Sequence, residues 1–108
     1  MICDWHYERA DKTAVYFAMK GFKVVTCPWR NPGVAVVQAE DMMQFRKDAT
    51  TVMKDNYQGL VQTEWSSPAS FMDGFYNKKK DDKGGEQTSW NCFNALYQKL
   101  KELNTVGR

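Results

Sequence analysis

The sequence predicts an α/β protein with three parallel βα units and a C-terminal helix. Three short apolar stretches, each too short for a helix, end in a tryptophan with polar neighbours. Stretches with the apolar spacing of a helix separate them and follow the third. Strand–helix–strand connections are right-handed and parallel in nearly all known cases, so the three strands are expected to form one parallel sheet.

The central strand is expected between Phe22 and Trp29 (FKVVTCPW), because this β-branched run follows a glycine and is stopped by a proline. The first strand is expected in Met1–Glu8 (MICDWHYE) and the third in residues 57–65, which run into the motif GLVQTEWSS (residues 59–67). The carboxyl ends of parallel strands meet at one edge of a sheet, where ligands bind. Three tryptophans are therefore expected at this rim: Trp5, Trp29 and Trp65.

The first two helices are expected in the crossovers between these strands. Asp11 or Thr13 can cap the first helix, which ends at Gly21. Residues 28–33 contain two prolines and a glycine and are expected to form a loop, followed by a long helix from about Ala39 to Asp55. Its apolar face is predicted to comprise Met42, Phe45, Ala49, Val52 and Met53.

Two further helices follow the third strand. Ser67 can cap a short helix that begins at Pro68. The last helix is expected to begin near Thr88 or Ser89 and to pack on the open side of the sheet. The chain is expected to form one unit in three parts: the βα units in residues 1–76, a charged loop in 77–87 and the C-terminal helix in 88–105.

Length and charge exclude several classes of function. A chain of 108 residues with 43% hydrophobic residues can bury one core, but it is too short for a (β/α)8 barrel of about 250 residues. The 15 basic and 13 acidic side chains are mixed along the chain, so a nucleic-acid partner is disfavoured. No apolar run approaches the length of a membrane segment, and the first residues do not resemble a signal peptide.

Neither a metal nor another cofactor is expected. The three cysteines are odd in number and lack a CxxC spacing, so they indicate neither a disulfide framework nor a zinc site. His6 is the only histidine and cannot join a multi-histidine site. The stretch Thr26–Trp29 (TCPW) does not favour a thioredoxin-like redox protein, because the second cysteine of the CxxC motif is missing.

The aromatic content of 14%, including four tryptophans, indicates a binding surface. A single tryptophan is more often a core residue, but three at strand ends favour a shared ligand site. A pyranose offers an apolar C–H face to an indole and hydroxyls to polar side chains, so a carbohydrate suits this mixture. The candidate substrate-binding residues are Trp5, His6, Glu8, Trp29, Arg30, Gln62, Glu64, Trp65 and Ser67.

The motifs CDWHYE, VVTCPW and GLVQTEWSS, at these spacings, resemble the last three βα units of the catalytic barrel of hexosaminidase-type glycoside hydrolases (family 20), especially divergent bacterial members. The resemblance covers residues 1 to about 76. The last strand of that family reads G-x-Q-x-x-L-W-x-E, in which the Trp stacks on the sugar and the Glu binds its hydroxyls. Gly59 and Trp65 keep this spacing, whereas Gln62 is displaced and Ser67 stands at the position of the Glu.

The resemblance implies that the chain is part of a TIM barrel whose parent enzyme, periplasmic or extracellular, binds an N-acetylhexosaminide-like carbohydrate. The family's general acid and neighbouring aspartate lie on an earlier strand, and none of Asp4, Glu8 and Glu64 matches them. No catalytic residue is therefore assigned, and the chain alone is expected to be inactive. Glu8 and Glu64 remain a possible acid/base pair only if their carboxyls approach within about 5 to 10 Å.

A second hypothesis is that the chain is a non-enzymatic interaction module. A three-stranded parallel sheet has two unpaired edges and one poorly covered face, so it is expected to pair with the remainder of a barrel or with another copy of itself. Aromatic side chains are also enriched in protein interfaces. The alternative is therefore a small α/β interaction module that oligomerises through its sheet edges.

Overall fold

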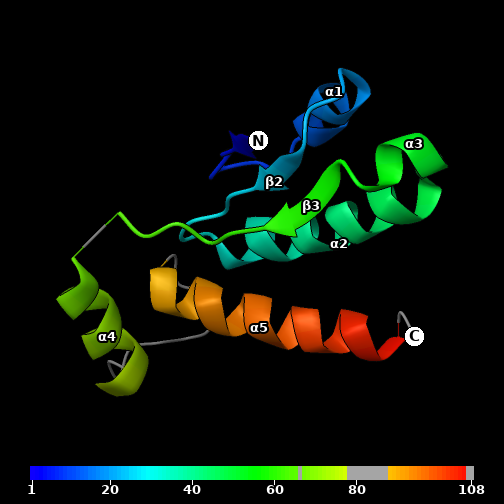
Figure 1. Ribbon diagram of the computed structural model, residues 1–108. Coiled ribbons are helices and arrows are strands. Elements are labelled where there is room, and N and C mark those ends of the chain that lie inside the picture. Colours follow the sequence, from blue (N-terminus) through cyan, green and yellow to red (C-terminus); the bar gives the residue numbers. More distant parts are fainter. Residues whose placement is uncertain (66, 78–87, 107–108) are drawn as a thin grey trace.

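The computed structural model describes residues 1–65, 67–77 and 88–106 (Figure 1). It is a mixed α/β structure in which three parallel strands form one sheet in the order β1-β2-β3, as predicted. None of the described helices is long and apolar enough to cross a membrane. The elements are β1 (Ile2–Asp4), α1 (Thr13–Met19), β2 (Val24–Thr26), α2 (Pro32–Asp48), α3 (Thr51–Lys54), β3 (Tyr57–Leu60), α4 (Pro68–Asn77) and α5 (Ser89–Val106).

The third strand is shorter than predicted. The expectation covered residues 57–65, but β3 ends at Leu60. The chain beyond it still follows the course of β2, because the Val61 N–H donates to the Thr26 carbonyl at 2.9 Å and the Thr63 N–H donates to the Pro28 carbonyl at 2.8 Å. The segment after β3 is therefore held beside the segment after β2 without forming regular strand.

A bulge in β3 keeps two large side chains on one face of the sheet. Val24 pairs with Tyr57 and Val25 with Gly59, so the register shifts between these two pairs. Gly59 has a φ of 128°, which a side chain would disfavour. Strict alternation would place Tyr57 and Leu60 on opposite faces, because they are three residues apart. With the bulge, both pack against helices.

The main core lies between the sheet and the first two helices. Its fully buried members come from α1, β2, α2 and β3: Ala14, Ala18, Val24, Met42 and Tyr57. Helices α1 and α2 therefore cover the same face of the sheet. Right-handed crossovers between strands in the order β1-β2-β3 require this arrangement.

The last helix packs against α2, and the expectation that it covers the open side of the sheet is wrong. Figure 1 shows α5 running alongside α2. Small α2 side chains, Ala35 and Ala39, contact Cys92 and Leu96 of α5 in a second buried cluster. Helix α2 has apolar side chains toward both the sheet and α5, which is why it can lie between them.

Helix α2 also begins earlier than predicted. The expectation of a loop through residue 33 and a helix from Ala39 is wrong, because α2 starts at Pro32. The Asn31 side chain accepts a hydrogen bond from the Val34 N–H at 3.1 Å. Proline at the first helical position loses no hydrogen bond, since that N–H has no partner within a helix. The Asn-Pro pair is therefore a helix start.

The same helix ends before the predicted Asp55. Helix α2 stops at Asp48, and Thr50 caps a separate short helix, α3, by accepting a hydrogen bond from the Met53 N–H at 3.3 Å. Val52 is 86% exposed, so its assignment to the apolar face is wrong. The other four residues assigned to that face are in the main core or pack against it.

The remaining helix boundaries give a mixed result. Neither Asp11 nor Thr13 caps α1, since its N-cap position is Lys12 and no side chain caps it. Gly21 follows α1 with a φ of 88°, as predicted. Caps at α4 and α5 are confirmed, because the hydroxyls of Ser67 and Thr88 accept hydrogen bonds from backbone N–H groups of the first helical turn. The charged loop predicted in 77–87 lies, apart from its first residue, outside the described residues.

Candidate functional site

An aromatic cluster forms where the segments after the three strands meet. Tyr7 lies at its centre. The Tyr7 ring is stacked on Trp5 at 5.6 Å between centroids and meets the Trp29 and Trp65 rings edge-on at 5.5 and 6.5 Å. The three tryptophans expected at one rim therefore share one aromatic neighbour. We use "aromatic cluster" for these four residues throughout.

The outer rings of the aromatic cluster face water. Trp5 is 63% exposed and Trp65 is 66% exposed, whereas Trp29 is half-buried. The Trp65 Nε1–H donates a hydrogen bond to the Tyr7 hydroxyl at 2.6 Å, which fixes the edge-on arrangement of these two rings. Exposed indoles held by directional contacts are typical of surfaces that stack on planar or ring-shaped ligands.

Arg30 extends the aromatic cluster with a positive charge. Its guanidinium carbon lies 4.4 Å from the centroid of the Trp29 ring, which is a cation–π arrangement. The Arg30 side chain is exposed. This predicted site residue therefore contacts the aromatic cluster directly.

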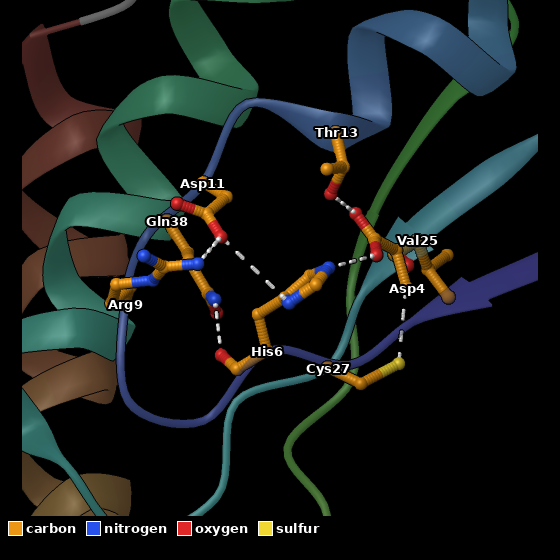
Figure 2. Close-up of polar contacts among 8 residues, drawn as sticks. All are labelled: Asp4, His6, Arg9, Asp11, Thr13, Val25, Cys27 and Gln38. Atoms are coloured by element: carbon orange, nitrogen blue, oxygen red, sulfur yellow. Dashed lines mark hydrogen bonds and ion pairs between the residues drawn. The ribbon is translucent and has the colours of Figure 1, made fainter.

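A buried carboxylate anchors the loop that carries Trp5 and Tyr7 (Figure 2). Asp4 ends β1 and is almost fully buried. Its Oδ1 lies 3.1 Å from Nε2 of His6, and its Oδ2 accepts a hydrogen bond from the Thr13 hydroxyl at 2.5 Å. Thr13 thus ties the first turn of α1 to the sheet, although it does not cap that helix.

His6 is held from three sides. Besides Asp4, Nδ1 of His6 lies 3.9 Å from Oδ2 of Asp11, which in turn pairs with Arg9 at 3.2 Å. Figure 2 also shows the Gln38 side chain of α2 reaching the backbone of the loop, where its Nε2 donates to the His6 carbonyl at 2.9 Å. These contacts hold His6 in the loop between Trp5 and Tyr7.

Three further predicted site residues, Glu8, Gln62 and Glu64, line two hollows. Glu8 is exposed and shares a shallow hollow with Trp5, His6, Tyr7 and Arg9. Gln62 and Glu64 line a larger cavity of about 590 Å³ beside Pro68, Phe71, Met72 and Phe93.

Two of the nine predicted residues are engaged with other elements. The Gln62 amide Nε2–H donates to the Ser89 carbonyl at 2.8 Å, so it anchors the start of α5. Ser67 accepts from the Ser70 N–H at 3.1 Å and caps α4. The structure therefore gathers six of the predicted residues at or beside the aromatic cluster: Trp5, His6, Glu8, Trp29, Arg30 and Trp65.

Tyr7 is the site residue that the sequence reasoning missed. Its position two residues after Trp5, in the same strand-end motif, was the available signal. In an extended segment, residues i and i+2 lie on the same side of the chain, so Tyr7 could have been expected beside Trp5.

The buried thiols near the sheet and in α5 are not reactive groups at neutral pH. Burial, and then the nearby Cys3 and Asp4, raise the pKa of the Cys27 thiol to about 11. Burial raises the pKa of the Cys92 thiol to about 11 as well. Both therefore remain protonated at pH 7, while the thiolate is the nucleophile. Within the described part of the chain, no group of three or more His, Cys, Asp or Glu side chains could hold a metal ion.

The sequence matches no known protein-family model and no curated protein.

Proposed function

We propose that this chain is the sugar-holding part of a carbohydrate-active hydrolase, a glycoside hydrolase of the β-N-acetylhexosaminidase type, and that it is inactive alone. The observation that carries the proposal is the aromatic cluster, in which Trp5 and Trp65 are largely exposed and both contact Tyr7. An indole plane attracts the apolar C–H face of a pyranose, and neighbouring polar groups can bind the hydroxyls.

The arrangement of elements supports a barrel origin. Three parallel strands lie in sequential order with α1 and α2 on one face, an arrangement that consecutive βα units of a (β/α)8 barrel also have. In such barrels, ligands bind at the carboxyl ends of the strands. The aromatic cluster occupies that edge, since its members follow β1, β2 and β3.

The binding experiment uses the full 108-residue chain. Titration with N-acetylglucosamine, followed by amide chemical shifts, should show saturable shifts at Trp5, Tyr7 and Trp65. Trp65→Ala should weaken binding about tenfold, the effect of losing one stacking partner worth 1 to 1.5 kcal/mol.

Tyr97→Ala is the matched control, because Tyr97 is an exposed aromatic residue of α5 that is not part of the aromatic cluster. This variant should bind as the unmodified chain does. Equal loss in both variants, or no saturable shift at all, would contradict the proposed saccharide site.

Inactivity of the chain alone is a separate expectation. The resemblance to family 20 places the acid pair on an earlier strand, and the substrate's own acetamido group acts as nucleophile in such enzymes. The purified chain should therefore release no aryl group from aryl N-acetyl-β-hexosaminides. Turnover that disappears in Glu8→Gln or Glu64→Gln would show that the catalytic carboxylates lie in this chain.

A second candidate function is an α/β interaction module that oligomerises through its sheet edges. Strands β1 and β3 are the two edge strands, and the nearby Met1 and Val61 side chains are largely exposed. Such edges favour pairing with another chain. Sedimentation that shows concentration-dependent association, in a chain that binds no saccharide, would favour this function, whereas a strict monomer at high concentration would exclude it.

A further inference from the structure

We infer that the aromatic cluster takes a saccharide that carries an anionic substituent, a carboxylate or a sulfate ester, and that Arg30 binds this group. The inference rests on the proposed saccharide site and adds the class of sugar. It starts from the position of Arg30, whose guanidinium carbon lies 4.4 Å from the Trp29 ring centroid. Trp29 in turn contacts Tyr7, the centre of the aromatic cluster.

Arg30 differs from the other two arginines that the structure describes. Arg9 pairs with Asp11 at 3.2 Å, and Arg46 donates a hydrogen bond to the carbonyl of Tyr57. Within the described residues, the ion pairs involve His6, Arg9 and Lys99, not Arg30. The guanidinium of Arg30 is thus exposed and uncompensated beside the proposed ligand surface.

Stacking leaves the hydrogen-bonding edge of a guanidinium available. The guanidinium carbon of Arg30 lies over the Trp29 ring, and the group carries five N–H donors in its own plane. This planar fork matches two oxygens of a carboxylate or sulfate. The contact with Trp29 also restricts the side chain before a ligand arrives, so less conformational entropy is lost on binding.

Asp4 and Asp11 are paired with groups other than Arg30. Asp4 is engaged by His6 and Thr13, and Asp11 by Arg9. The residues that line the hollow of Glu8 and the cavity of Glu64 do not include Arg30. An anionic substituent of a ring stacked on the aromatic cluster beside Trp29 would therefore meet the exposed guanidinium of Arg30.

The test compares three sugars on the full chain by amide chemical shifts: N-acetylglucosamine, N-acetylglucosamine 6-sulfate and glucuronic acid. At least one anionic sugar should bind about fivefold more tightly than the neutral sugar, as expected for one exposed charge pair of about 1 kcal/mol. The sugar that shows the gain identifies the source of the charge as a sulfate ester or a carboxylate.

Variants then assign the gain to Arg30. Arg30→Gln should bind all three sugars with the affinity of the neutral one, and Arg30→Lys should keep only part of the gain, because lysine lacks the planar fork. Lys23→Gln is the matched control, since it removes an equal charge from an exposed side chain at the amino end of β2, away from the aromatic cluster. It should leave the gain intact.

Two results would overturn the inference about Arg30 without contradicting the proposed saccharide site. In the first, the neutral sugar binds and neither anionic sugar binds more tightly. In the second, the gain in affinity is unchanged in Arg30→Gln. Either result would mean that Arg30 does not bind an anionic group, while the proposed saccharide site is retained. If none of the three sugars binds, both ideas fail. Sodium sulfate alone should not displace the neutral sugar, and displacement would show a simple anion site instead.

Discussion

Large apolar side chains are buried on the helix-covered face of the sheet but exposed at the carboxyl edge of its strands. On the covered face, Val24, Met42 and Tyr57 are hidden from water by α1 and α2. At the edge, Trp5 and Trp65 expose most of their surface, although they are the larger side chains. Burial places the first set, whereas hydrogen bonds and ring contacts place the second. Stability and ligand binding should therefore respond to different substitutions.

The largest loss of stability is expected in the covered face. Met42→Ala removes a side chain that is 3% exposed, and deletions of this kind cost about 2 to 5 kcal/mol. Denaturant unfolding should show this loss. Met43→Ala is the control, because the neighbouring Met43 is exposed and should cost less than about 1 kcal/mol. Equal losses would mean that the covered face is not the main source of stability.

The next largest loss of stability is expected at Asp4, which joins β1 to the loop that carries Trp5 and Tyr7. In Asp4→Asn, the amide cannot serve both His6 and Thr13 as the carboxylate does, which should cost about 1 to 3 kcal/mol. The amide resonances of Trp5 and Tyr7 should also shift, because this anchor holds their loop. Asp11→Asn should change less, since its contact to His6 is 3.9 Å. An Asp4→Asn variant with unchanged stability would show that the contacts between the aromatic rings are sufficient to position the loop that carries Trp5 and Tyr7.

A smaller effect is expected at the start of α2. Asn31→Ala removes the oxygen that accepts from the Val34 N–H, which should cost about 1 kcal/mol in thermal or denaturant unfolding. Asn31→Asp keeps an acceptor at this position and adds a charge that favours a helix N-terminus, so it should restore stability. If both variants lose the same stability, the cap does not stabilise the helix.

The smallest loss of stability is expected at the edge itself. Trp65→Ala removes one exposed hydrogen bond to Tyr7 and little buried area, so the loss should be about 0.5 kcal/mol. A buried tryptophan would lose about 3 to 5 kcal/mol in the same change. The melting temperature of this variant, compared with its saccharide affinity, separates the two roles. A large drop in melting temperature with unchanged affinity would make Trp65 a core residue.

The sequence was sufficient to predict the parallel sheet and the location of three tryptophans at one edge of it. Both follow from a general rule, since right-handed crossovers align strands in parallel and bring their carboxyl ends to one edge. It was not sufficient for the location of α5. The surface that α5 covers depends on the small side chains of α2, Ala35 and Ala39, and an apolar period cannot say which neighbour a helix will meet.

The boundary errors have local physical causes. Two prolines and a glycine in residues 28–33 predict a loop, although asparagine followed by proline is also a helix-start signal. Strand β3 ends at Leu60 because the chain beyond it follows β2 only through isolated backbone hydrogen bonds to Thr26 and Pro28, and the bulge at Gly59 is not revealed by a pattern of alternation. The three tryptophans alone do not indicate Tyr7, whose place in the aromatic cluster follows from its position two residues after Trp5.

The position of Tyr7 has an optical consequence. Three of the four tryptophans in the sequence lie in the aromatic cluster, and the fourth, Trp90, is in α5. The intrinsic fluorescence of the protein therefore originates largely from one place. Trp5 and Trp65 are exposed and should emit at long wavelength, whereas Arg30 lies against Trp29. A molecule that covers the exposed indoles should shift the emission to shorter wavelength, so the protein carries its own reporter of occupancy.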